Sequence, residues 1–494
     1  MKTVKENIGK NPFIGISMQW RALLIVYVVV YNILTPGLRE VVANSSAPLS
    51  GLRLAGELVY QLLLFAPIFF YQPRFGWLHP LIFPTILGIG KGFLKNIAQV
   101  FEPLAIGSAP QEVLTNPELT QFSSEQMAWA SVEHTGLSIL SLLCYYGGFF
   151  FAQRYTSFDF RPARLRFSRP RYVSVLCTAA VGLSAVMALV WVQQHGGLSS
   201  YMVSYFGSGR ARTRGEMGGT IFFVVGLGVV ASLVWYAIDD NAFKNPLFWV
   251  ALAYAVPVNF FITGSRSSVF IAAVLFLMVW MLRHQKLPKG RVLLLGFSAV
   301  VLLSIMGEFR RSSWEGRMRW DVFLETSVTE AIDQTQEEAD QRQNVQGGVP
   351  VMASVPEEVG FLKGKSYAGA VFFFVPRFIW EDKPRASGGL NAELILGRVE
   401  GGGAVPIGPV AEAYWNFSVP GVVIIFFFYG IFHQGLARTV RRYPYAAVFA
   451  LYVLVMVKIK PASHAITTGS RDIVAAIGLL FAVGAFAWRR SSKS

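Results

Sequence analysis

Apolar runs close to twenty residues long recur along the whole chain and are separated by short connections rich in arginine and lysine. A transmembrane helix needs about 20 apolar residues to cross a hydrocarbon core of about 30 Å. About twelve such runs are present, and we find no ten-residue segments of alternating polarity that would indicate a membrane β-barrel. The runs cover residues 20–35, 54–71, 79–97, 136–153, 173–192, 219–238, 247–263, 267–282, 292–306, 415–435, 444–459 and 472–488.

This pattern predicts an all-α, polytopic integral membrane protein, because helices satisfy their own backbone hydrogen bonds in lipid. The composition agrees, since 53% of the 494 residues are hydrophobic, 15% are charged and the mean hydropathy is +0.45. We expect three regions. Residues 1–306 form a first part of the bundle with about nine helices, 307–408 form a large loop with amphipathic or re-entrant helices, and 409–494 add about three helices.

The charges on the connections predict the orientation of the helices. If both chain ends lie inside, the connections on that side carry 22 Lys and Arg but only 4 Asp and Glu, whereas the rest of the chain carries 22 and 25. This asymmetry is typical of cytoplasmic loops, so the net charge of +15 needs no nucleic-acid partner. We therefore expect both termini in the cytoplasm and the large loop outside, with the first apolar run retained as a span rather than cleaved as a signal peptide.

The densest polar chemistry lies between Val375 and Phe417, directly before the apolar run that starts near Val419. Charge beside a bilayer is destabilising and is usually kept for function. Glu412 and Asn416 are four residues apart and are expected to share a helix face. Alternatively, Glu412 is a first-turn acid that favours the helix dipole, and its aromatic neighbours are interfacial belt residues. The charged and aromatic members are Arg377, Glu381, Asp382, Lys383, Arg385, Glu412, Trp380, Tyr414 and Trp415.

The tetrapeptide Thr-Gly-Ser-Arg occurs twice, at 263–266 and 468–471. We expect each copy at the outer tip of a helical hairpin, where it opens the descending helix. Backbone N–H groups, the positive end of the dipole and a guanidinium would then meet, which suits a phosphate. The alternative is an ordinary turn and N-cap whose arginine reaches for lipid headgroups. Arg210, with Arg212 and Arg214 in a Gly- and Ser-rich loop, is equally consistent with an anion clamp and with a solvated loop.

These features together resemble the O-antigen polymerases of the Wzy type, also called oligosaccharide repeat unit polymerases. The resemblance rests on the number of spans, the large late loop, Gly-Ser-Arg at a hairpin tip and two motifs. At one position the chain departs from the family, because many relatives have glycine after Asn-Phe and this chain has Ser418. The motifs are PR…W…KP…GG (Pro376, Arg377, Trp380, Lys383, Pro384, Gly388, Gly389) and E-x-Y-x-N-F (Glu412, Tyr414, Asn416, Phe417).

The resemblance implies a fold like that of the GT-C-type membrane glycosyltransferases, in the bacterial inner membrane. The implied reaction transfers a growing glycan from its undecaprenyl diphosphate to another lipid-linked repeat unit, and its implied protein partners are a chain-length regulator and a flippase. A leaving diphosphate calls for cations and N–H donors. The expected catalytic residues are Glu412, His464 and Arg377. The expected diphosphate-binding residues are Arg266, Arg471, Lys383, Arg385, Arg210, Ser265 and Ser470, and the expected sugar-binding residues are Trp380, Tyr414, Trp415 and Asn416.

Other functions remain open at this point. An O-antigen ligase would use the same chemistry with a different acceptor. A secondary transporter or lipid-oligosaccharide flippase is less favoured, because the charges in the spans (Glu57, Lys91 and Lys458) cluster toward their outer ends rather than at the bilayer midplane. An assembly partner in an envelope complex would leave the arginine tips unexplained. We expect no cofactor and no metal, since Cys144 and Cys177 fall within predicted spans and no Cys or His set has metal-ligand spacing.

Overall fold

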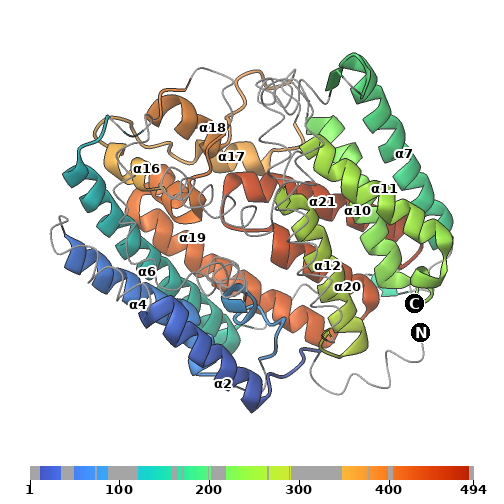
Figure 1. Ribbon diagram of the computed structural model, residues 1–494, viewed down its shortest axis with the longest axis horizontal. Helices are drawn as coiled ribbons and strands as arrows, with labels where there is room; N and C mark the ends of the chain where they lie inside the picture. The colour runs from blue at the N-terminus through green and yellow to red at the C-terminus, as the bar shows by residue number, and fades with distance from the viewer. Residues whose placement is uncertain are drawn as a thin grey trace, which may run out of the picture.

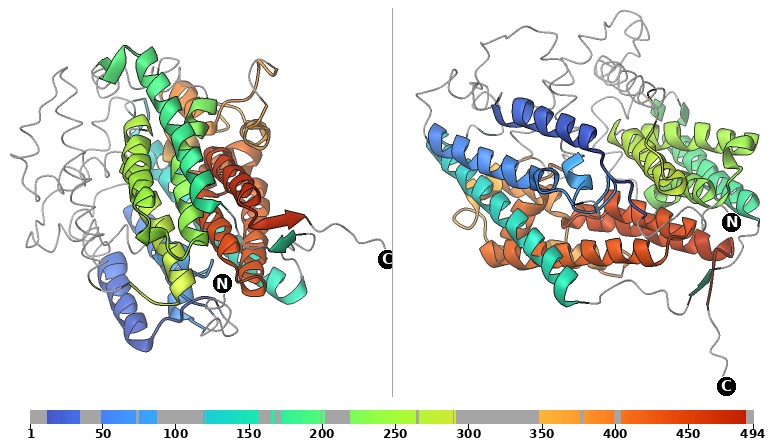
Figure 2. Two further views of the ribbon diagram at one scale, coloured as in Figure 1. Left: turned by 90° about the vertical axis from the view of Figure 1, so that its right-hand side faces the viewer. Right: turned by 90° about the horizontal axis from the view of Figure 1, so that it is seen from below.

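The computed structural model describes residues 12–34, 49–72, 75–86, 119, 121–156, 165–167, 172–198, 200–201, 219–263, 266–288, 290, 348–375, 379–398 and 404–488. Over these ranges the chain is a bundle of helices (Figure 1). Two three-residue strands, β1 (Leu165–Phe167) and β2 (Phe486–Trp488), pair antiparallel at the edge of the molecule (Figure 2). The predicted helical fold is confirmed for these ranges.

Five described helices are long and apolar enough to cross a membrane, namely α4 (Ser50–Phe69), α6 (Ser124–Tyr155), α7 (Val173–Gln194), α19 (Gly408–Arg442) and α21 (Ser463–Ala482). Further apolar helices are α2 (Met18–Tyr27), which continues as the π-helix η1 (Val28–Leu34), α10 (Gly219–Ile238), α11 (Pro246–Thr263), α12 (Arg266–His284) and α20 (Ala446–Lys458). The predicted runs at 79–97 and 292–306 lie mostly or wholly outside the described residues. The helices thus support the predicted membrane protein.

The helices pack around two apolar cores. One joins α7, α10, α11, α12, α20, α21 and the end of α19, and it contains the completely buried Trp235. The other joins α6 to α19 and to the short segments packed on them, and it contains the completely buried Trp415. Helices α6 and α19 run in the same direction, and they approach each other most closely at two glycines. A Cβ atom on Gly430 would collide with the carbonyl oxygen of Tyr145, and one on Gly148 with that of Phe427. Small residues allow this approach, as is typical of helix pairs in membranes.

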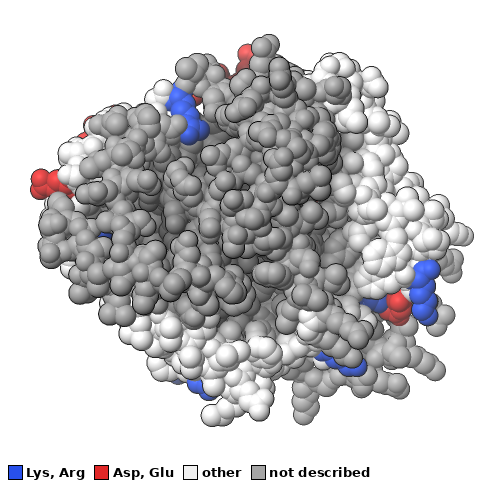
Figure 3. Space-filling model, viewed as in Figure 1, with Lys and Arg blue, Asp and Glu red and all other residues white. Residues whose placement is uncertain are grey.

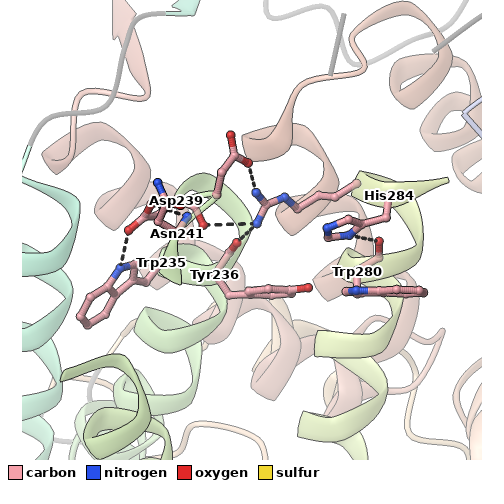
Figure 4. Close-up of polar contacts among 8 residues, drawn as sticks. Trp235, Tyr236, Asp239, Asn241, Trp280 and His284 are labelled. Carbon is pink, nitrogen blue, oxygen red and sulfur yellow. Dashed lines mark hydrogen bonds and ion pairs between the residues drawn. The ribbon is translucent and has the colours of Figure 1, made fainter. Parts of the chain in front are cut away.

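Basic side chains close the C-terminal ends of several helices. Arg283 of α12 donates to the carbonyl oxygen of Tyr236 near the end of α10 and forms an ion pair with Asp240, in the group of polar contacts shown in Figure 4. Because the last carbonyls of a helix carry the negative end of its dipole, a cation there is stabilising. Two more helices end in the same way, with carbonyls that accept hydrogen bonds from an arginine of another helix: α6 from Arg438 and α4 from Arg21.

The short helices of the large loop gather at one end of the molecule, around the start of α19 (Figure 1). They are α16 (Val349–Ser354), α17 (Lys365–Val371), α18 (Ser387–Leu390) and the π-helix η6 (Asn391–Ile395). These short helices lie within the region 307–408, for which amphipathic or re-entrant helices were predicted, and α17 ends at Val371 and is followed by a turn. Figure 3 shows a broad strip of described surface along the right-hand side that is mostly uncharged. A small group of charged side chains lies at the lower end of this strip.

Candidate functional site

A buried carboxylate links three segments of the chain. Glu412 lies in the second turn of α19 and is 1% exposed. Its Oε1 atom accepts a hydrogen bond from Ser366 Oγ of α17 at 2.7 Å, and its Oε2 atom accepts one from the backbone N–H of Ser463, the first residue of α21, at 3.0 Å. A carboxylate buried away from water requires such partners. Glu412 therefore caps another helix, rather than its own helix as the alternative reading of the sequence had it.

Asn416 completes this cluster one turn further along α19. Its Nδ2 atom donates to Ser366 Oγ at 2.9 Å and to the carbonyl oxygen of Glu412 at 2.8 Å, so the predicted shared face of these two residues is confirmed. Both amide hydrogens are engaged, whereas Oδ1 is buried without a hydrogen-bond partner in the described part of the chain. Ser387 extends the cluster, because its Oγ atom lies 3.5 Å from that of Ser463.

The second Thr-Gly-Ser-Arg motif does not form the predicted hairpin tip. Helix α21 begins at Ser463, so the motif lies inside the helix, and the predicted set of unbonded N–H groups there is wrong. Gly469 instead serves packing, since a Cβ atom at this position would lie 2.7 Å from Ile459 Cδ1. The sequence predicted that the start of this helix binds a substrate anion. In the structure, the N–H group of Ser463 at the start of α21 donates to the carboxylate of Glu412 instead. The first copy lies between α11 and α12, as predicted.

Two predicted cationic residues meet at Phe373. The guanidinium carbon of Arg471 lies 6.0 Å from the centre of its ring, and Lys383 Nζ donates to its carbonyl oxygen at 3.1 Å. Arg385 forms a half-exposed ion pair with Glu393, with 2.8 Å between Nη1 and Oε2. Ser470 is half-buried on α21. Four other predicted positions lie outside the described residues or have no described side chain: Arg210, Ser265, Arg266 and Arg377.

The three predicted sugar-stacking rings have different environments. Trp415 is completely buried, and its Nε1 atom donates to the carbonyl oxygen of Gly360 at 3.2 Å, so it fixes the loop before α17. Tyr414 is buried as well, and its hydroxyl lies 3.4 Å from the carbonyl oxygen of Val355. Trp380 is half-buried and contacts the ring of Phe372 edge-on at 6.2 Å. Of the three, Trp380 presents the most accessible ring.

Two titratable side chains lie on the segments that meet at Glu412. His464 follows Ser463 directly and is exposed at the start of α21. The hydroxyl of Tyr367 donates to the carbonyl oxygen of Pro461 at 3.0 Å, and its ring stacks on that of Phe417. Burial raises the pKa of Tyr367 above its usual value, and the charge of Glu412 raises it further. Tyr367 consequently stays protonated at neutral pH and cannot act as the base.

Sequence reasoning missed Ser366, Ser387 and Ser463, because a buried serine between helices carries no motif. The contacts of Glu412 with α17 and α21 could not be predicted from the sequence either, since these partners are 46 and 51 residues away along the chain. Among the described residues, no group of three or more His, Cys, Asp or Glu side chains comes together that could hold a metal ion.

Residues 220–446 of the chain match a family model described as a domain of unknown function, DUF8712. The matched region begins in α10 and ends at the start of α20, so it contains Glu412 but not Ser463, His464 or Arg471. No curated protein matches the chain, and no solved structure matches it.

Proposed function

We propose that this chain is a metal-independent glycosyltransferase of the Wzy O-antigen polymerase type. It would join polyprenyl-diphosphate-linked repeat units into a surface polysaccharide. In this proposal about twelve helices form a GT-C-like bundle in the bacterial inner membrane, with both termini in the cytoplasm. The observation that carries the proposal is the convergence of α17, α19 and α21 on the buried Glu412, with Arg471 about two turns further along α21 than Ser463 and Lys383 at the same Phe373 as Arg471.

The proposed reaction assigns each group a role. The hydroxyl oxygen of the acceptor sugar attacks the anomeric carbon of the donor, the bond from that carbon to the diphosphate oxygen breaks, and the electron pair leaves with the diphosphate. The hydroxyl proton moves to Glu412, with His464 as the second candidate base. Arg471, Lys383 and the undescribed Arg377 and Arg266 would stabilise the charge of the leaving group.

Ser366 fixes the orientation of the Glu412 carboxylate by a hydrogen bond. Its hydroxyl occupies Oε1 of Glu412 at 2.7 Å, and the acceptor hydroxyl would replace it there. The Oδ1 atom of Asn416, which has no hydrogen-bond partner among the described residues, is a second acceptor in the same buried cluster. Both acceptors suit a hydroxyl-rich ligand better than an anion, which agrees with a sugar at Glu412 and a diphosphate nearer to Arg471.

The test uses Glu412→Gln in purified protein supplied with a lipid-diphosphate repeat unit. The glutamine can still accept from the Ser463 N–H and donate to Ser366 Oγ, so the fold is kept while the base is lost. We expect the wild type to produce a ladder of longer glycans and the variant to be slower by about 100-fold or more. Glu357→Gln, at an exposed position on the loop before α17, is the control and should retain full activity.

Three outcomes would contradict the proposal. Undiminished polymerisation by Glu412→Gln would exclude Glu412 as the base. A single addition onto a lipid A core acceptor would identify a ligase. Movement of the lipid-linked substrate across the membrane without new glycosidic bonds would identify a transporter.

A further inference from the structure

The segment that follows α17 exposes several large apolar side chains, although it lies outside the long apolar helices. Between residues 371 and 379, Val371 is 58%, Phe372 46%, Phe374 67% and Ile379 67% exposed. On a water-facing loop such a group is unusual, because contiguous apolar surface marks a contact with another molecule or with lipid.

The contact of this segment with α21 fixes its depth. Phe373 packs under the guanidinium of Arg471, and Arg471 and Asp472 are the last charged residues before an uninterrupted apolar run, residues 473–482. At 1.5 Å per residue the contact lies about 12 Å along α21 from Ser463. The exposed side chains therefore lie where the polar start of α21 meets its apolar part, which is the level of the membrane–water boundary, where aromatic side chains concentrate.

Two cationic side chains, Lys383 and Arg471, contact this segment, and two exposed acids, Glu381 and Asp382, directly precede Lys383 in the chain. Lys383 Nζ donates to the carbonyl oxygens of Phe373 at 3.1 Å and of Val375 at 2.9 Å, and so fixes the turn that carries the exposed rings. Positive charge beside apolar side chains is the arrangement that binds an anionic headgroup above an acyl chain. Aromatic rings backed by Lys383 and Arg471 thus fit a phospholipid surface better than a protein partner.

We propose that residues 371–375 and 379–380 insert Phe372, Phe374 and Ile379 into the bilayer leaflet at the Ser463 end of α21. The segment would then hold α17, and with it Ser366, at the level of the lipid headgroups. A lipid-linked phosphate presents its reactive bond at this level. The inference itself requires only that the chain is a membrane protein, so it stands or falls separately from the proposed activity.

The experiment places a fluorescent bimane label at Phe374→Cys or Ile379→Cys, in full-length protein that carries Cys144→Ala and Cys177→Ala, reconstituted in phosphatidylcholine vesicles. Quenching is measured with acyl-chain-brominated phosphatidylcholine and with aqueous iodide. Glu357→Cys, exposed on the neighbouring loop, is the water-facing control. Phe428→Cys, 62% exposed on α19, is the lipid-facing control. Val371→Cys replaces either test variant if that variant does not stay monodisperse.

We expect brominated lipid to quench the labels at 374 and 379 at least about twice as strongly as the label at 357. We also expect both labels to be protected from iodide to the same extent as the label at 428. Iodide quenching equal to that at 357 would show a solvated loop. Absence of quenching by either reagent would show a surface covered by protein. Either of these two results overturns the proposal.

Discussion

At the scale of single residues, Glu412 is stabilised in a buried position by two hydrogen bonds from different helices. One comes from the start of α21, where the helix dipole favours a negative charge. The other comes from Ser366, which also accepts from Asn416 and so connects the two polar residues of α19. Loss of Ser366 would affect both of them, because a buried polar group left without its partner is destabilising.

We predict that Ser366→Ala lowers the free energy of unfolding by about 1–2 kcal/mol. Thermal unfolding in detergent micelles would measure the change. Ser354→Ala is the matched control, because Ser354 is also 1% exposed but its hydroxyl has no hydrogen-bond partner in the described part of the chain. That change should leave stability equal or slightly increased. Equal losses in the two variants would mean that the Ser366 hydrogen bonds contribute nothing specific.

At the scale of elements, α19 is two helices joined by a kink. Phe417 (φ −142°) and Ser418 (φ 57°, ψ −157°) depart from helical geometry just before Pro420, where the sequence allows a kink. Proline removes one backbone donor and clashes with the carbonyl of the residue four positions earlier. Ser418 adopts a conformation that is almost restricted to glycine.

We predict that Ser418→Gly raises stability by about 1 kcal/mol, because glycine adopts this conformation without steric strain. The apparent melting temperature in detergent should rise by a few degrees. Ser418→Ala retains a Cβ atom and should give no gain. A melting temperature of Ser418→Gly at or below that of the wild type would refute strain at this kink.

The crossing of α6 and α19 gives a second prediction at this scale. Gly430→Ala should lower the free energy of unfolding by about 1–3 kcal/mol, because the added methyl group would meet the Tyr145 backbone and push the helices apart. The control is Gly136→Ala on α6, where no atom lies within 4 Å of the new Cβ and helix propensity favours alanine. Thermal unfolding of both variants measures the two changes in stability. A Gly430→Ala protein as stable as the wild type would show that the two helices are not closely packed at this crossing.

At the scale of the whole molecule, arginines at the ends of several apolar helices also cap neighbouring helices. Arg21, Arg283 and Arg438 each donate to carbonyls at the end of a neighbouring helix. The positive charge that orients a membrane protein is thus also used to stabilise the bundle. Orientation and packing are therefore coupled in this chain.

We predict that Glu357 and Asn241 lie on opposite sides of the membrane. Each is replaced by cysteine in the background without Cys144 and Cys177, since both positions are exposed. A membrane-impermeant thiol reagent should label Glu357→Cys in intact cells, and Asn241→Cys only after permeabilisation. The reason is that six predicted spans separate the connection that contains Asn241 from the N-terminus, which we expect in the cytoplasm. The opposite labelling pattern would invert the orientation, and labelling of both in intact cells would contradict alternating spans.

The apolar pattern by itself determined the class of protein and the approximate positions of ten predicted runs that overlap described helices, because a helix in lipid needs a run of about 20 mostly apolar residues. It also determined that Glu412 and Asn416 share a face, because this depends only on spacing within one helix.

Only the tertiary structure decided which groups meet. It brought Ser366 and Ser463 to Glu412, placed the second Thr-Gly-Ser-Arg motif inside α21 and enclosed Trp415 in the core. These contacts join segments far apart along the chain, and local periodicity carries no information about such distant pairs. A helix start likewise depends on what caps it, and here the cap comes from another helix.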